Sequence, residues 1–477
     1  MATDGGWDDV ALADEVARLT RAAKARINRA VAMIASGGSS CNSTNKSSRK
    51  RRSNENADNH APRPRTKSTR RGNGQAGAIT ASNGCRGRGT VNHNEKQAQG
   101  RKPRPVKVRG ILKVKSAASS ALRGDKAPTA LRRHWAKVRL APLSRVIMVG
   151  TECSGLESVM AALDLMGLRG KSRLRFVCEK DSAARKLILA HQKPDIVYQD
   201  ITHRPVQGMP TCDLYAAGFP CQPFSTAGLH EGADDRHGRG RIFPHVAEYI
   251  RQKTPKCFVL ENVKGLTSKT HHKTFLDMLA TLRSDGKYLV TWRVMNTADY
   301  GIPQNRPRLY VVGMLRSALP DGEVRFKWPC PTGCTPLNLL LEPKTVKREQ
   351  PRRGTVAHKK LIKLIRRLDK QGLAQSSTAI ALDIFAATGR AMVGRVPCLT
   401  RSRAGAGGYW ITTTAGLLTT REMLRLQGLP ERLINAAELA GISERQLRQM
   451  IGNAMSVNVL VILLGRLLPA MGLAKST

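Results

Sequence analysis

Residues 146–200 read VIMVGTECSGLESVMAALDLMGLRGKSRLRFVCEKDSAARKLILAHQKPDIVYQD, and their pattern decides the fold. Short apolar runs alternate with segments in which apolar residues recur at helical spacing. The apolar runs are 146–149, 174–178 and 196–198, and the helical segments between them are 156–166 and 182–191. Further apolar runs follow at 214–217, 258–260 and 309–312. This alternation is typical of βαβ units, so the sequence predicts an α/β fold with a doubly wound, mostly parallel sheet.

The residues that follow the first three apolar runs indicate a cofactor site, because ligands of such sheets bind beyond the carboxyl ends of the strands. The first run leads into the turn GTECSG at 150–155, whose backbone N–H groups could meet a carboxylate or a phosphate. Glu179 ends the second run and can accept hydrogen bonds from both ribose hydroxyls. Asp200 follows the third, where it can contact an adenine amino group. Two acids in series favour an adenosine-type cofactor over a coincidence of solvated charges.

The next two runs end in residues suited to nucleophilic catalysis. The fourth leads to GFPCQPFS at 218–225, which places Cys221 between two prolines, and the fifth leads to Glu261. A thiol at one strand end that faces a carboxyl group from the next makes a pair of nucleophile and acid. A cysteine beside proline is more often structural, but its pairing with Glu261 and the two cofactor acids favours catalysis.

Two arginines precede the sixth run. Arg306 and Arg308 stand two residues apart on an extended segment, so their side chains point the same way. They could hold an active-site loop, a phosphate or a base edge. Structural ion pairing is the alternative for either one.

The chain is strongly basic. Its 477 residues include 80 Lys and Arg against 35 Asp and Glu, a formal net charge of +45. Residues 41–140 hold 26 basic and 4 acidic side chains, which is about half of the excess. The part that is predicted to fold carries the rest, as a surface that binds nucleic acid phosphates would.

A membrane surface also carries negative charge, but the sequence does not favour it as the partner of this basic chain. The longest apolar run, residues 457–473, is interrupted by Asn458 and Arg466. The N-terminal segment begins with acidic residues such as Asp4 rather than with the basic start of a secretory signal. The ten cysteines follow no disulfide spacing, and we expect free thiols in a soluble intracellular protein.

The first 140 residues are expected to form two segments that are not part of the catalytic core. Residues 1–35 are expected to form an amphipathic helix, which through residues 8–35 could bind a partner helix or pack on the enzyme. Residues 36–140 are rich in Ser, Asn, Gly, Arg and Lys, so we expect a disordered basic arm. The basic cluster at 49–52 indicates a nuclear location, and other basic runs in the arm suit a minor groove.

Four sequence blocks carry a resemblance to a known family. They are Pro220-Cys221-Gln222, Glu261-Asn262-Val263, Gln304-Asn305-Arg306-Pro307-Arg308 and Gly452-Asn453-Ala454-Met455. In this order and spacing, the chain resembles the cytosine-C5 DNA methyltransferases over about residues 145–470. The resemblance implies a Rossmann-like class I methyltransferase fold with S-adenosylmethionine as cofactor. It also implies double-stranded DNA as partner, with the target cytosine flipped out.

The resemblance implies a role for each matched residue. Cys221 attacks C6 of the flipped cytosine, Glu261 contacts N3, Arg306 holds the base and the catalytic loop, and Arg308 supports them. The residues expected to bind the cofactor are Cys153, Ser154, Gly155, Leu156, Glu179, Lys180, Asp200, Ile201, Pro220, Ile242, Asn453 and Met455. Those expected to contact nucleic acid are Gln222, Ser225 and Gln304.

The first turn departs from the family pattern. Where the family has Phe and two further glycines, this chain has Cys153, Glu157 and Ser158, and only Gly155 of that set is retained. No metal is expected, because Cys330 and Cys334 lack a convincing second pair of zinc ligands.

The catalytic core is expected at residues 141–317 and 397–477, with a target-recognition region at 318–396 between its two parts. That region is short and basic, which suits a simple sequence context. Two alternatives stay open: a relative that methylates cytosine in RNA, and a catalytically silent member of the fold that binds DNA.

Overall fold

The computed structural model describes residues 106–107, 138, 140–142, 145–220 and 242–476. The predicted helix at 1–35 lies outside these residues, as do most of the basic arm and Cys221, Gln222 and Ser225. Two residues of the predicted arm, Val106–Lys107, form strand β1, which pairs with the edge of the main sheet.

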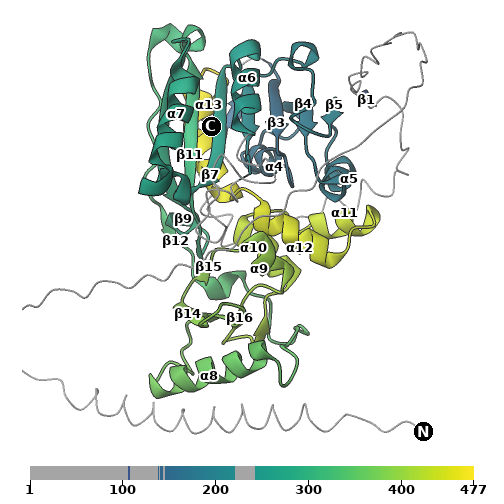
Figure 1. Cartoon of the computed structure of the whole chain (residues 1–477), viewed down its shortest axis with the longest axis vertical. Coiled ribbons are helices and arrows are strands. Elements are labelled where there is room, and N and C mark those ends of the chain that lie inside the picture. The colour runs from purple at the N-terminus through teal and green to yellow at the C-terminus, as the bar shows by residue number, and fades with distance from the viewer. Residues whose placement is uncertain (1–105, 108–137, 139, 143–144, 221–241, 477) are drawn as a thin grey trace, which may run out of the picture. The chain divides into compact units, whose positions relative to one another are not determined.

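An eight-stranded sheet forms the centre of the described chain, in the order β1-β5-β4-β3-β6-β7-β11-β8 (Figure 1). Its other strands are β3 (Ile147–Glu152), β4 (Ser172–Cys178), β5 (Ile196–Tyr198), β6 (Leu214–Ala217), β7 (Cys257–Val263), β8 (Tyr288–Asn296) and β11 (Pro307–Leu315). Strands β3 to β7 run parallel, and so the predicted fold class is confirmed. The strand order reverses beside β3, between β4 and β6, and a crevice at such a point binds ligands in open α/β sheets.

The edge of the sheet formed by β11 and β8 is antiparallel, whereas a fully parallel sheet would be the simplest expectation. β11 pairs with β7 in the antiparallel direction, and β8 pairs antiparallel with β11. No strand was predicted for β8, because polar residues interrupt its apolar pattern at Thr291 and Arg293. A strand at the edge of a sheet buries fewer side chains than a central strand and leaves a weaker sequence signal.

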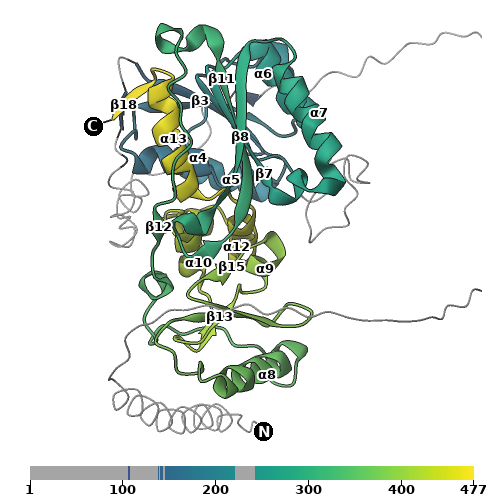
Figure 2. The ribbon, with the colours of Figure 1, turned by 90° about the vertical axis from the view of Figure 1, so that its left-hand side faces the viewer.

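Helices cover both faces of the sheet (Figure 2). On one face, α4 (Ser158–Leu165), α5 (Ser182–His191) and α13 (Val457–Ala470) pack in one apolar cluster with the strands. On the other face, α6 (Phe243–Lys253) and α7 (His272–Arg283) form a second cluster. α5 begins where predicted, and the Asp181 side chain accepts hydrogen bonds from the first free N–H groups of that helix.

A smaller sheet and one helix carry most of the predicted target-recognition region. The strand order is β14-β13-β16-β17. The strands are β13 (Ile380–Asp383), β14 (Arg390–Val393), β16 (Trp410–Ile411) and β17 (Gly416–Leu417). Helix α8 (Val356–Lys370) packs Leu361, Leu364 and Leu368 against this sheet. β16 and β17 come from beyond residue 396, so the small sheet includes residues from the predicted C-terminal part of the core.

Shorter helices and strands make up much of the rest of the described chain. The helices are α9 (Arg401–Gly405), α10 (Thr420–Gln427), α11 (Leu433–Leu439) and α12 (Glu444–Asn453). The short strands are β2 (Leu140–Pro142), β9 (Tyr300–Gly301), β10 (Gln304–Asn305), β12 (Gly333–Cys334), β15 (Val396–Pro397) and β18 (Ala474–Ser476). No single helix of the described chain has the length and apolarity to cross a membrane; α12 and α13, bent by 41°, would pass as a pair on length and composition alone.

Candidate active site

The turn after β3 lies against the carboxyl end of β4. Cys153, Gly155 and Glu157 have positive φ angles of 51°, 55° and 56°. The Gly155 N–H donates to Glu179 Oε2 at 2.9 Å, and the Ser154 N–H donates to the Cys178 carbonyl at 3.3 Å. The structure therefore brings the predicted turn and the predicted ribose-binding acid together.

The second acid of the predicted cofactor site follows β5, next to β4. Asp200 accepts hydrogen bonds from the Thr202 N–H at 2.9 Å and from its hydroxyl at 2.7 Å. Lys180 Nζ lies 3.1 Å from Asp200 Oδ2, so this predicted cofactor residue pairs with the acid instead of standing apart. Partial burial works to raise the pKa of Asp200, but the hydrogen bonds from Thr202 and Lys180 hold it below the ordinary value.

Two predicted cofactor residues have side chains that pack in the apolar clusters rather than at the carboxyl ends of the strands. Leu156 is buried among the residues under α4, and Ile201 packs in the opposite cluster. Their backbone groups, not their side chains, are what a cofactor could contact.

Glu157 stands where the family has glycine, and it is buried. Its Oε1 accepts a hydrogen bond from the Thr151 hydroxyl at 2.5 Å, while its Oε2 is buried without a partner in the described part of the chain. Burial raises the pKa of Glu157 to about 7, against the effect of the hydrogen bonds from Thr151 and Ser154. A glutamate with positive φ is also strained, since only glycine adopts that conformation freely.

Glu157 should make the stability of the fold depend on pH. Its folded-state pKa lies above the ordinary value of 4.5, so the folded protein keeps this proton between about pH 4.5 and 7. Stability therefore falls as pH rises through that window, by about 3 kcal/mol for a shift of this size. In Glu157→Gln this fall is expected to disappear, as measured by urea unfolding at pH 5 and pH 8.

The matched control is Glu438→Gln, which changes an exposed glutamate at the end of α11. It should keep the pH dependence of the wild type. Equal pH dependence in the wild type and in Glu157→Gln would show that the buried carboxyl does not hold a proton near neutral pH.

A buried ion pair lies directly beneath the turn and was not predicted. Arg204 binds both carboxylate oxygens of Glu152, at 3.0 Å for Nη2 to Oε2, and both side chains are fully buried. The Tyr215 hydroxyl donates to the same carboxylate, and Arg204 Nη2 donates to the His245 carbonyl at 2.7 Å. The only sequence signal is an acid at the end of an otherwise apolar strand.

The remaining predicted cofactor residues lie at the ends of other elements. Met455 lies about 3.7 Å from where a side chain at Gly218 would begin, so the C-terminal block folds back beside the end of β6. Asn453 is exposed at the end of α12. Pro220 and Ile242 are half-buried at the two borders of residues 221–241, which lie outside the described chain.

Glu261 and Arg308 form the second part of the site. Arg308 Nε lies 3.2 Å from Glu261 Oε1, and both side chains are almost fully buried. Burial raises the pKa of Glu261, and the charges of Arg308 and Arg306 offset only part of that rise. One prediction needs correction: β7 continues to Val263, so Glu261 lies within a strand rather than after its end. Asn262 Nδ2 donates to the Phe219 carbonyl at 3.4 Å and ties β7 to the segment that leads to Cys221.

Arg306 is a buried cross-link between distant parts of the chain. Its Nη1 donates to the Leu399 carbonyl at 2.7 Å and its Nη2 to the Ala454 carbonyl at 2.8 Å. The same Nη1 also lies 3.4 Å from Cys398 Sγ. Arg306 thus holds the C-terminal block and the segment after β15 in place.

Gln304, which is predicted to contact nucleic acid, has a fully buried side chain in the structure. Its Nε2 donates to the Leu426 carbonyl at 2.7 Å, and its Oε1 accepts from the Leu399 N–H at 2.8 Å. Both ends of the amide are used inside the protein, so Gln304 supports the site without facing solvent.

Among the described residues, no group of three or more His, Cys, Asp or Glu side chains is arranged to hold a metal. Cys330 is exposed and Cys334 is half-buried. The predicted nucleophile Cys221 and the predicted nucleic-acid contacts Gln222 and Ser225 lie outside the described residues.

A mostly parallel sheet with acids after β4 and β5, and a turn after β3 that closes on the first of them, is consistent with a class I methyltransferase fold. Residues 153–468 match the family described as C-5 cytosine-specific DNA methylase. The chain belongs to this family, as its four sequence blocks predicted, and is accordingly classed as a DNA cytosine-5-methyltransferase.

Several relatives are similar over most of their length. The type II methyltransferase M.NgoBI of Neisseria gonorrhoeae is 35% identical over 60% of this chain and 83% of its own. M.HaeII of Haemophilus aegyptius is 31% identical over 58% of this chain and 80% of its own. Among solved structures, the S. pombe Dnmt2 methyltransferase aligns with 68% of this chain and 99% of its own, at 18% identity and a TM-score of 0.45.

Proposed function

We propose that this chain transfers a methyl group from S-adenosylmethionine to C5 of cytosine in DNA, through a covalent bond between the Cys221 sulfur and C6. The observation that carries the proposal is Glu261. This acid is buried in β7, next to the strand that leads to Cys221, and it faces an arginine. A family whose description specifies DNA cytosine supports the substrate.

The described residues fit the cofactor. Glu179 and Asp200 offer carboxylates for the ribose hydroxyls and the adenine amino group, at the carboxyl ends of neighbouring strands. Among the described residues, apart from Gly155 and its two chain neighbours, no atom comes within 4 Å of the position where a side chain at Gly155 would begin, so the turn leaves room beside its backbone. When bound, S-adenosylmethionine supplies an electrophilic methyl group.

The reaction follows from the chemistry of a thiolate and a cytosine ring. The Cys221 thiolate adds to C6, which moves electron density to C5 and N3. C5 then takes the methyl group, whose bond to the sulfonium sulfur breaks and leaves its electron pair on that sulfur. Loss of the C5 proton to a base restores the double bond as the thiolate leaves. The thiol must first lose its proton, and a basic environment would favour that loss.

Glu261 is suited to the charge that develops at N3. A neutral carboxyl group can donate a hydrogen bond, whereas a carboxylate can only accept one. The raised pKa of Glu261 increases the share of the neutral form, and Arg308 keeps the charged form from being left unpaired in a buried site. The target base must leave the duplex to reach such a buried group.

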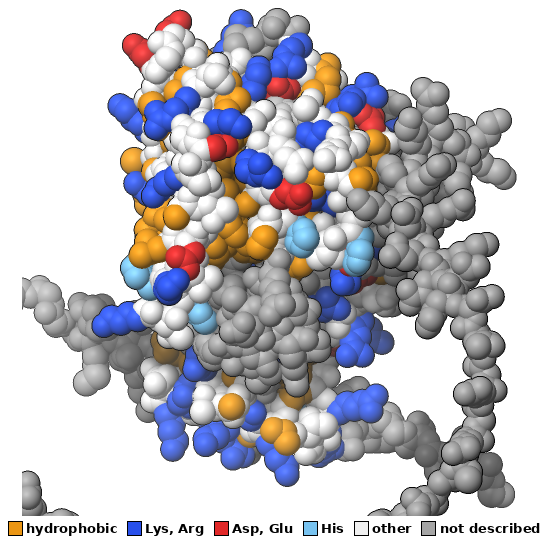
Figure 3. Space-filling model, turned by 45° about the horizontal axis from the view of Figure 1, so that its top comes forward, with side chains coloured by type: hydrophobic (Ala, Val, Ile, Leu, Met, Phe, Trp, Pro, Cys, Tyr) orange, Lys and Arg blue, Asp and Glu red, His pale blue; other side chains and the backbone are white. Residues whose placement is uncertain are grey.

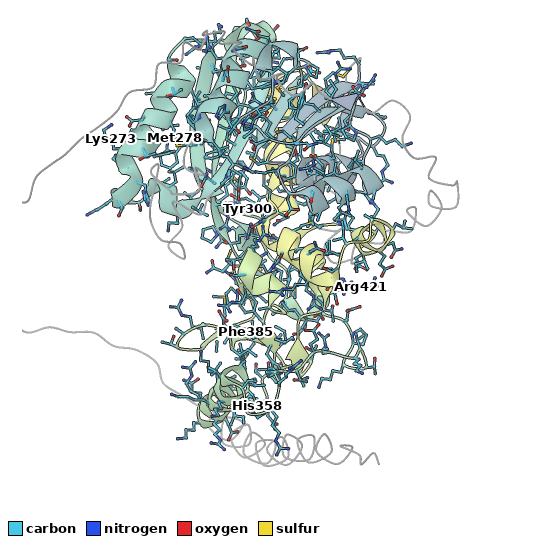
Figure 4. All side chains as sticks on the ribbon, turned by 45° about the vertical axis from the view of Figure 1, so that its right-hand side comes forward. Lys273, Met278, Tyr300, His358, Phe385 and Arg421 are labelled. Atoms are coloured by element: carbon cyan, nitrogen blue, oxygen red, sulfur yellow. The ribbon has the colours of Figure 1, made fainter. Side chains whose placement is uncertain are left out.

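Helix α8 offers a surface for the nucleic acid. Its exposed residues include Lys359, Lys363, Arg366, Arg367 and Lys370, all on the face opposite its buried leucines. Within the described chain, none of the five pairs with an acid. Figure 3 shows Lys and Arg side chains gathered at this lower end of the molecule, and Figure 4 shows His358 of α8 at the end farthest from the large sheet.

Neutralising α8 should weaken DNA binding and reduce its dependence on salt. In the variant with Lys359, Lys363 and Arg366 changed to glutamine, the slope of log affinity against log salt should fall by up to about 3, since each lost phosphate contact removes about 0.9. Fluorescence anisotropy of a labelled duplex at several salt concentrations measures this slope.

The matched control changes Lys171, Lys186 and Lys193 to glutamine. These lysines are also exposed: Lys171 and Lys193 lie just before β4 and β5, at the amino ends of parallel strands, and Lys186 lies within α5. The same loss of slope in both variants would mean that α8 only adds to the general charge of the protein.

The test of the proposed function is methyl transfer from radiolabelled S-adenosylmethionine to unmethylated DNA, half-methylated DNA and RNA, with Cys221→Ala beside the wild type. Label in DNA that is absent with the variant supports the proposal. Label in RNA in preference to DNA would make the chain an RNA methyltransferase. No label on any of them, with DNA still bound, would indicate a silent DNA-binding member of the fold.

A further inference from the structure

A second cysteine lies against the two arginines of the site. Cys398 Sγ accepts a hydrogen bond from Arg308 Nη2 at 3.4 Å and another from Arg306 Nη1 at 3.4 Å. The parallel pairing of β10 with β15 explains this contact. It sets Asn305 beside Pro397, so Arg306 and Cys398 are the next residues in register.

The sulfur is one of several acceptors around Arg308. Arg308 Nε faces Glu261 Oε1 at 3.2 Å, and Nη1 donates to the Pro307 carbonyl at 2.9 Å. The guanidinium is planar, so acceptors on several of its N–H groups fix its orientation as well as its position. A chain of contacts thus runs from Glu261 through Arg308 to Cys398.

We propose that Cys398 is a positioning residue that holds Arg308 against Glu261. The inference rests on the proposed function, because Glu261 is the group that meets the target base there. Cys398 itself touches neither the base nor the cofactor in this scheme. It acts through Arg308, which pairs with the Glu261 side chain and lowers the pKa of its carboxyl group.

The charges around the sulfur support this role. Burial works to raise the pKa of the Cys398 thiol, but Arg308 and Arg306 outweigh it and hold that pKa below the ordinary value. A thiolate accepts hydrogen bonds from a guanidinium more strongly than a neutral thiol does. The Tyr409 hydroxyl donates to the Cys398 carbonyl at 2.7 Å, and the charged residues near Tyr409 are Asp383 and Arg403.

The first test compares Cys398→Ala, Cys398→Ser and the wild type in steady-state methylation. Alanine should lower kcat about 10-fold, since a displaced catalytic group costs rate without loss of binding, and leave KM for DNA within about twofold. Serine, which still accepts an N–H, should recover most of the loss. With alanine the pH dependence of kcat that belongs to Glu261 should move to higher pH, because Arg308 lowers the pKa of that acid less.

Cys257→Ala is the matched control. It removes another buried thiol of the site's own strand, at the opposite end of β7, and should leave kcat and its pH dependence unchanged. A Cys398→Ala enzyme with the wild-type kcat and pH profile would overturn the proposal.

The second test measures the sulfur directly. The rate of alkylation of Cys398 by iodoacetamide, followed against pH by peptide mass spectrometry, should reach its half-maximum at lower pH than that of the exposed Cys330. In Arg308→Met the Cys398 midpoint should move to higher pH. No movement would overturn the inference whether or not the chain methylates DNA, whereas a failure of wild-type methylation would count against the proposed function alone.

Discussion

Replacing Glu261 by glutamine is expected to lower the rate of methyl transfer by about 10²- to 10⁴-fold, the usual range for a lost acid or base. Glutamine keeps the shape of the side chain but cannot ionise, so it cannot follow the charge on N3 or pair with Arg308. DNA binding should change little, because the side chain is buried in β7. Single-turnover transfer of labelled methyl groups to saturating DNA measures the chemical step.

Two controls separate chemistry from folding. Glu438→Gln changes an exposed glutamate on α11 and should leave the single-turnover rate unchanged. Thermal unfolding should show that Glu261→Gln is folded at the assay temperature. A rate within about threefold of the wild type would remove Glu261 from the mechanism and would leave its contact with Arg308 as a structural ion pair.

Much of the main sheet could be predicted because its strands are buried on both faces. Continuous apolar runs at 196–198 and 214–217 have the same bounds as β5 and β6. The direction of β11 could not be predicted, since an apolar run gives no indication of which way its strand runs. The end of the small sheet was missed because the two residues of β16 and the two of β17 are too short to give a period.

The cofactor part of the site could be predicted for a simple reason. In a parallel sheet the strand ends meet at one edge, so residues just after apolar runs become neighbours without further information. The contact between Gly155 and Glu179 follows from that rule. Lys180 follows Glu179 directly in the sequence, but its ion pair with Asp200 depends on side-chain directions that no spacing shows.

The catalytic part was harder to predict because its contacts join segments far apart in sequence. Arg306 and Cys398 are 92 residues apart, and Gln304 and Leu426 are 122 residues apart. A polar residue in a family block was interpreted as a contact with DNA, although burial has given Gln304 a structural role. The nuclear location stays a prediction, since the basic cluster at 49–52 lies outside the described residues.

Arg204→Met should be the most destabilising of these substitutions, by about 3–5 kcal/mol, because it leaves a buried carboxylate without its partner. Glu152 is fully buried and, among the donors in the described part of the chain, would keep only the Tyr215 hydroxyl. Urea unfolding of the wild type and the variant at pH 7.5 measures the loss.

The same ion pair connects stability to the cofactor turn. Glu152 is the last residue of β3, Tyr215 lies in the neighbouring strand β6, and Arg204 follows β5. Burial raises the pKa of Glu152 even with Arg204 in place. Without the arginine, the carboxylate must therefore take up a proton or bind a water molecule. Adding Glu152→Gln to Arg204→Met removes the buried charge and should recover at least half of the lost stability. If the double variant is as unstable as Arg204→Met, the loss comes from the packing of the arginine rather than from the charge that it leaves behind.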